Sequence, residues 1–141
     1  MIRQCFYSFH YQQDSWRVSQ IRNIGIVEGN KAASDNDWET LATGGETAIK
    51  RWINGQMYGR SCVVVLIGAH TANRRWVQYE IEKGWNDRKG VLGIHIHNLR
   101  DRLGNTSARG SNPFSKPNIK GIPLASIVKT YGNPPIFSEF C

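Results

Sequence analysis

The sequence predicts an α/β layer sandwich with a central parallel sheet. Apolar runs that suit strands alternate along the chain with segments of helical periodicity, an order typical of parallel strands covered by helices. The run SCVVVLIG, residues 61–68, is nearly all apolar and β-branched, as expected of a central strand that is buried on both faces. The length of 141 residues, without a repeat or a linker, predicts one domain over residues 1–141.

The first part of the chain is expected to form a strand, a helix and a second strand. The first strand covers about residues 2–10, and its alternate side chains point to opposite faces of the sheet. One face takes Cys5, Tyr7 and Phe9, and the other takes Phe6, Ser8 and His10. A helix follows to about Asn23, with Asp14 or Ser15 as its N-cap, because short polar side chains stabilise that position. The run IGIVE, residues 24–28, predicts the second strand, and the polar residues 29–40 predict a loop.

The middle of the chain predicts two further helices, each followed by a strand. Residues 45–54 form a helix whose apolar stripe contains Ala48, Ile49, Trp52 and Ile53. The strand at residues 61–68 comes next, followed by a helix over residues 72–87. The next strand, residues 90–99, has two alternating faces: Leu92, Ile94 and Ile96 on one, and Gly93, His95 and His97 on the other.

The last part of the chain has weaker signals. Residues 98–118 are polar and are interrupted by glycine and proline, which predicts a long loop. Residues 122–131, IPLASIVKTY, are expected to form a last strand or a helix, in a C-terminal part that is otherwise irregular.

The composition favours a soluble, cytoplasmic protein. The formal charge is +7, but the basic residues are scattered, so a generic basic surface is favoured over a nucleic-acid partner. The cysteines, Cys5, Cys62 and Cys141, are odd in number and without CxxC spacing, and are expected to be reduced and structural. No signal peptide opens the chain, and no apolar run approaches the ~20 residues of a membrane helix.

Common catalytic motifs are absent, and no metal is expected. The sequence has no GxGxxG, GxxxxGK[ST] or GxSxG pattern. His95 and His97 share one face of a strand, but no nearby cysteine or acid completes a set of metal ligands. The pair is interpreted as two histidines with satisfied hydrogen bonds that line a cleft.

The carboxyl ends of the strands mark the expected substrate site. In open α/β sheets, ligands bind beyond these ends, where connections diverge to opposite faces. A flavodoxin-like order makes the first and third predicted strands neighbours at that point. The first strand offers Ser8, Phe9 and His10, and the third offers Gly68, Ala69 and His70.

Glu80 is the candidate catalytic group in the helix that follows. Val77, Ile81 and Trp85 form the buried stripe of this helix, and Glu80 lies at its edge, one turn after Trp76. Helical geometry alone leaves two interpretations open, a catalytic carboxylate or an ordinary charge at the boundary of the core.

Five segments together resemble the TIR-like family that includes the Thoeris antiphage TIR proteins of bacteria. They lie in order within residues 6–117: FYSFHYQQDSWRVSQIRN, SDNDWE, AIKRWINGQM, SCVVVLIGAHTANRRWVQYEIEKGW and GVLGIHIHNLRDRLGN. The octapeptide RRWVQYEI also resembles the wider TIR superfamily, in which a helix bearing W-V-x-x-E-I supplies the glutamate of NAD-cleaving members. The resemblance implies a flavodoxin-like TIR fold, a three-layer sandwich around a parallel sheet.

The resemblance also implies roles for individual residues. It places the catalytic glutamate on Glu80, the tryptophan that shapes the site on Trp76, and a histidine needed for activity on His95 first and His97 second. The loop at residues 29–45 lacks the R-D-x-x-P-G pattern of receptor TIR domains, and Asp37 and Trp38 are the interpretation for the residues that close over NAD. A terminal helix that relatives carry is expected to be missing.

The function that the resemblance implies is cleavage of the nicotinamide–ribose bond of NAD in a Thoeris-type antiphage system. The product would be a cyclic or conjugated ADP-ribose messenger that activates a separate effector protein, with self-association on activation. NAD is the substrate, and no cofactor is expected. Two alternatives stay open: a catalytically silent TIR-like adaptor that acts through protein contacts, and a nucleoside-processing transferase of similar architecture.

Overall fold

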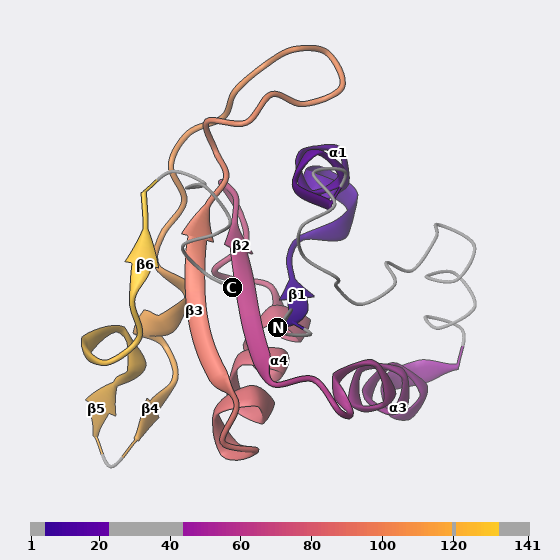
Figure 1. The fold of residues 1–141 in the computed structure, drawn as a ribbon, viewed down its shortest axis with the longest axis vertical. Coiled ribbons are helices and arrows are strands. Elements are labelled where there is room, and N and C mark those ends of the chain that lie inside the picture. The colour runs from indigo at the N-terminus through magenta and orange to yellow at the C-terminus, as the bar shows by residue number, and fades with distance from the viewer. Residues whose placement is uncertain (1–4, 23–43, 120, 133–141) are drawn as a thin grey trace.

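A four-stranded parallel sheet forms the centre of the protein in its computed structural model, which describes residues 5–22, 44–119 and 121–132 (Figure 1). The strands are β1 (Cys5–Ser8), β2 (Cys62–Ile67), β3 (Gly90–His95) and β6 (Thr130–Tyr131), in the spatial order β1-β2-β3-β6. Each neighbouring pair is parallel. The sheet confirms the predicted α/β class, and the first and third predicted strands, β1 and β2, are neighbours. The predicted strand at residues 24–28 and the loop at residues 29–40 lie outside the described residues.

Helices cover both faces of the sheet, which confirms the three-layer arrangement. Helix α1 (Tyr11–Arg22) contributes Val18 to a core that contains Tyr7 and Leu66. On the other face, α3 (Gly45–Met57) and α4 (Arg75–Asn86) contribute apolar side chains to a second core, which also holds Phe6 and Val65. The two faces of β1 therefore divide as the alternation of residues 5–10 predicts.

Helix α1 begins earlier than the sequence predicts. The backbone N–H of Asp14 donates to the carbonyl of His10 over 2.9 Å, which is already a helical hydrogen bond. The Nδ1 atom of His10 also accepts a hydrogen bond from the N–H of Gln13. The expectation of Asp14 or Ser15 as the N-cap is therefore wrong, because His10 satisfies donors of the first turn and Asp14 lies inside the helix.

The other predicted elements differ from the structure mainly at their ends. Helix α3 continues to Met57, which is buried and extends the apolar stripe by one turn. Strand β2 is buried along its whole length, as expected of a central strand. Strand β3 ends at His95, and the following backbone turns, with the N–H of Leu99 bonded to the carbonyl of Ile96.

The predicted loop at residues 98–118 is irregular except for the short 3₁₀ helix η1 (Pro113–Ser115) and its last residue, Asn118, which begins a short strand. Its Phe114 is fully buried in the core beneath α4. Strands β4 (Asn118–Ile119) and β5 (Ile122–Pro123) then pair antiparallel, and the 3₁₀ helix η2 (Leu124–Ser126) leads to β6. Residues 122–131 thus contain short pieces of both strand and helix.

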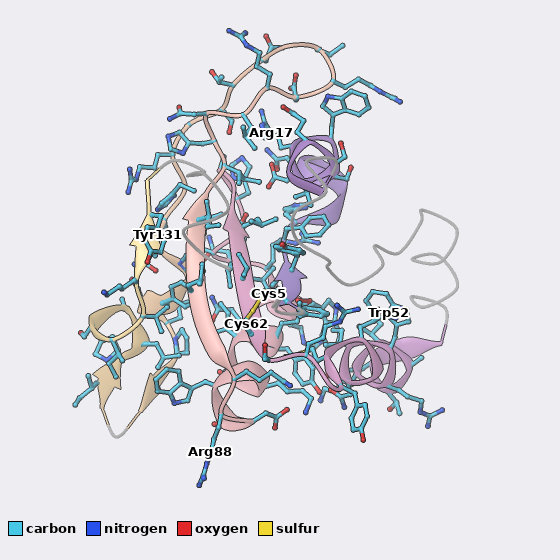
Figure 2. The ribbon with its side chains drawn as sticks, in the orientation of Figure 1. Cys5, Arg17, Trp52, Cys62, Arg88 and Tyr131 are labelled. Atoms are coloured by element: carbon cyan, nitrogen blue, oxygen red, sulfur yellow. A yellow bond between two sulfur atoms is a disulfide. The ribbon has the colours of Figure 1, made fainter. Side chains whose placement is uncertain are left out.

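A disulfide joins Cys5 to Cys62, which makes the expectation of reduced cysteines wrong for this pair (Figure 2). The two residues are partners in the parallel register of β1 and β2, with their Cα atoms 4.8 Å apart. Partners in neighbouring strands direct their side chains to the same face, so the register brings the two sulfur atoms together. Separately, the described residues include no helix of the length and apolar character that crossing a membrane requires.

Candidate active site

Glu80 lies in the second turn of α4 and is buried, with 8% of its surface exposed. Its neighbours along the helix stripe, Val77 and Ile81, are buried in the core. The sequence predicts Glu80 at the edge of this stripe. In the structure, Glu80 is more deeply buried than a residue at the edge of the core usually is. Ser8, the last residue of β1, is fully buried and interacts with the Glu80 carboxyl group.

Burial raises the pKa of Glu80 from its ordinary 4.5 to about 8. The Ser8 hydroxyl opposes this shift and lowers the pKa in part. The approach of the two groups falls short of a full hydrogen bond, because neither Ser8 Oγ nor Glu80 Oε2 has a hydrogen-bond partner among the described residues. A carboxyl group held without a partner away from water is costly for folding, which is typical of a functional position.

We expect Glu80→Gln to stabilise the protein by an amount that grows from pH 5 to pH 8. The folded state binds the Glu80 proton more tightly than the unfolded state does, because the folded pKa is raised. The stability that wild type gains from protonated Glu80 is fully present below about pH 4.5 and is lost as the pH rises through about 8. Glutamine does not titrate. The free energy of unfolding of the variant, relative to that of wild type, should therefore increase by roughly 3 kcal/mol from pH 5 to pH 8.

Urea unfolding of both proteins at pH 5 and pH 8 measures this difference. Glu82→Gln is the matched control, because Glu82 is exposed on the same helix. Parallel pH dependences in wild type and Glu80→Gln would show that Glu80 is not a buried titrating group.

His95 and His97 lie at the carboxyl end of β3 with their rings edge to face, 5.8 Å apart between centroids. Ile94 and Ile96 belong to the core beneath α1, so the alternate residue His95 points to the opposite face, where α4 lies. His95 is buried, and burial lowers its pKa, with Arg109 and His97 adding to the effect. The structure thus brings Ser8, Glu80 and His95 to one face and one end of the sheet.

A second group of predicted residues gathers beyond β1 and β2. Burial lowers the pKa of His10, and the nearby Arg74 and His70 lower it further. His70 is exposed in the turn after β2, where Thr71 Oγ1 accepts a hydrogen bond from the N–H of Gly68 over 2.8 Å. These basic side chains are close enough to interact with one another, as expected at a site for an anionic ligand.

Trp76 and Phe9 have visible packing roles. Trp76 is half-buried, meets Tyr79 edge to face at 5.7 Å, and has the Arg75 guanidinium 4.9 Å from its ring centroid. Phe9 packs against the core beneath α1, on the other face from Glu80. Their roles in substrate binding stay predictions. Asp37 and Trp38 lie outside the described residues.

Asp14 and Arg17 form a buried ion pair that the sequence analysis did not predict. Arg17 Nη1 lies 3.2 Å from Asp14 Oδ1, and the same guanidinium donates to the carbonyls of Leu99 and Asn105. Burial raises the pKa of Asp14, and Arg17 opposes that effect. The sequence signal for this ion pair is an acid and an arginine that are three residues apart on one helix. Asp14 faces Gly68, where any added side chain would collide with its carboxylate.

Buried polar atoms without a partner concentrate at this end of the molecule. Among the described residues, the buried side-chain atoms that have no hydrogen-bond partner are Ser8 Oγ, Asp14 Oδ2, Glu80 Oε2, His95 Nδ1, His97 Nδ1 and Ser107 Oγ. All of them belong to the carboxyl ends of strands or to the helices and loop beside those ends. Folded proteins rarely leave such atoms unpaired, so their concentration indicates a site for a polar ligand. The part of the chain that the structure describes holds no group of three metal-ligating side chains.

Two comparisons with known proteins gave a match. The family model for "Thoeris protein ThsB, TIR-like domain" matches residues 6–101. The chain is also 40% identical over 119 residues to a curated Bacillus cereus (strain MSX-D12) protein named "Putative cyclic ADP-D-ribose synthase ThsB1". That match covers 81% of this chain and 62% of the relative, so the chain spans less than two thirds of the relative's length.

Proposed function

This chain belongs to the Thoeris ThsB family of TIR-like domains, and on that premise we propose that it cleaves NAD and converts it into a cyclic ADP-ribose. The observation that carries the proposal is Glu80, a buried carboxyl group without a full hydrogen bond, at the ligand-binding end of the sheet. The cyclic product is proposed from the name of the Bacillus cereus relative.

A single carboxylate is sufficient for this reaction. An ordinary glycosidase needs a second carboxyl group as an acid, because a sugar alkoxide leaves poorly unless it is protonated. The nicotinamide of NAD is a cationic pyridinium, and it leaves with the bonding electron pair as a neutral molecule. Glu80 then has to hold the ribose hydroxyls and to stabilise the positive charge that develops at the ribose.

The fate of the ribose cation decides the product. Attack by water gives ADP-ribose, and attack by a nucleophile of the same molecule gives a cyclic isomer. When the internal nucleophile is a hydroxyl group, its proton passes to Glu80 or to solvent. The burial around Glu80 favours the internal attack, because it keeps water away from the reacting carbon.

The remaining predicted residues are proposed to bind the substrate. His95 and His97 contact the nucleotide from the end of β3, with His95 required for activity. Ser8 orients Glu80, while Phe9, His10, His70, Trp76, Asp37 and Trp38 complete the substrate site. NAD is consumed in this scheme as a substrate, and the chemistry requires neither a cofactor nor a metal.

The biological role that we propose is signalling in antiphage defence. The cyclic ADP-ribose activates a separate effector protein, and the TIR-like domains associate with one another on activation. The competing proposal is a catalytically silent adaptor, for which Glu80 would have no importance. The exposed basic residues would carry its contacts with partners.

Mass spectrometry of cells that express the protein, with and without phage challenge, tests the proposal. We expect NAD to fall while nicotinamide and an isomer with the mass of ADP-ribose minus water accumulate. Phage challenge supplies whatever trigger the enzyme needs. Protection against phage without any loss of NAD would instead favour the adaptor.

A further inference from the structure

Three buried polar atoms at the end of β3 have no partner among the described residues. They are the Nδ1 atoms of His95 and His97 and the hydroxyl oxygen of Ser107. The backbone N–H of Ser107 donates to the carbonyl of His97 over 2.9 Å, which fixes Ser107 beside the histidine pair. Unpaired groups that are buried together suit a ligand with several hydrogen-bonding oxygen atoms.

The charge around these atoms is positive. Arg109, two residues after Ser107, is exposed and lies near enough to His95 to lower the pKa of that histidine. The basic side chains that act on His95 are those of Arg109 and His97, and no carboxylate of the described residues acts on it. A guanidinium beside unpaired donors, without a balancing acid, is suited to phosphate oxygens.

The loop that carries Ser107 and Arg109 is held against the sheet. At Gly110, an added Cβ atom would collide with the backbone of Gly68, at the end of β2. Earlier in the same loop, Arg17 donates to the carbonyls of Leu99 and Asn105. Figure 1 shows this loop and α1 beyond the same end of the sheet. These contacts pre-organise the loop, which lowers the entropy cost of binding a ligand.

The distance between Glu80 and the side chains at the end of β3 fits one nucleotide. Ser8 pairs with Val65 on β2, and His95 pairs with Ile67. Two strand spacings and an offset of two residues separate Ser8 from His95 by roughly 12 Å between Cα atoms. This separation is of the same order as the length of a ribose with its 5′-diphosphate.

We propose that Ser107 and Arg109, together with His95 and His97, form the binding site for the diphosphate group of the nucleotide. This inference rests on the proposed function and adds the position of the substrate. The ribose that loses nicotinamide lies at Ser8 and Glu80, and the diphosphate lies at the end of β3.

Calorimetric titration with ADP tests the site without any turnover. We expect the double variant Ser107→Ala, Arg109→Gln to bind ADP at least about tenfold more weakly than wild type, because charge-assisted hydrogen bonds are lost. Arg102→Gln is the matched control, since Arg102 is an exposed arginine of the same loop that stacks on Trp16. Adenosine, which has no phosphate, should bind wild type much more weakly than ADP does. Equal affinity of wild type and the double variant for ADP would overturn the proposal.

Kinetics with two substrates separates this inference from the proposed function. Nicotinamide riboside lacks the diphosphate, so the preference for NAD over nicotinamide riboside in kcat/KM should fall at least about tenfold in the double variant. If the double variant keeps the full preference for NAD, the diphosphate site is wrong and the NAD-cleaving function stands. If wild type cleaves neither substrate in triggered extracts, the proposed function is wrong, and the ADP titration still decides whether the anion site exists.

Discussion

Replacing Glu80 with glutamine should lower NAD consumption by at least about a hundredfold and leave the protein folded. Glutamine keeps the size of the side chain but cannot carry the negative charge that opposes the charge developing on the ribose. The loss should appear mainly in kcat, because the interaction is strongest in the transition state. Nicotinamide release by the purified, activated protein measures the effect, and Glu82→Gln on the exposed side of the same helix should retain wild-type turnover.

The pH dependence of wild type adds a second measurement to this experiment. In the proposed mechanism Glu80 acts in its ionised form, and burial raises its pKa in the free protein to about 8. The value of kcat/KM should therefore rise about tenfold per pH unit below pH 8 and level off above it. Bound NAD brings the pyridinium cation near Glu80 and lowers that pKa, so the rise in kcat should occur at lower pH. Unchanged turnover in Glu80→Gln would remove Glu80 from the mechanism.

Replacing Arg17 with methionine should lower the free energy of unfolding by about 3–5 kcal/mol. The change leaves the Asp14 carboxyl group buried without its cation and removes the donors to the carbonyls of Leu99 and Asn105. Urea unfolding at neutral pH measures the loss. Arg102→Met, in an exposed position, should change the stability by no more than about 0.5 kcal/mol.

A second variant shows whether the lost ion pair causes the loss of stability in Arg17→Met. Asp14→Asn in the Arg17→Met background removes the unpaired charge, so it should recover part of the stability. A loss of less than about 1 kcal/mol in Arg17→Met would mean that the pair does not hold α1 against the loop after β3.

The sequence predicted the elements whose patterns are local. The alternation in residues 5–10 assigned the two faces of β1 correctly, and the apolar run at residues 61–68 identified the buried β2. Helical periodicity placed Glu80 beside the buried stripe of α4. These signals succeed because neighbouring residues on one strand or helix are enough to define which face is apolar.

The sequence did not predict the features that depend on contacts between distant segments. The disulfide between Cys5 and Cys62 follows from the register of two strands that are far apart in the chain. Asp14 has the side chain of an N-cap residue, but in the structure it pairs with Arg17 and its carboxylate faces Gly68. Ser107 and Arg109, the proposed diphosphate-binding residues, lie in a polar loop without any local pattern that marks a site.

The sequence alone determined the α/β architecture, the family resemblance and the choice of Glu80. Tertiary structure decided that Glu80 is buried enough to hold a pKa of about 8, and that Ser8 and His95 share its face of the sheet. The physical reason is that a pKa and a ligand site depend on the surroundings of a side chain in space. In this protein, residues from β1, α4, β3 and the loop after β3 supply those surroundings together.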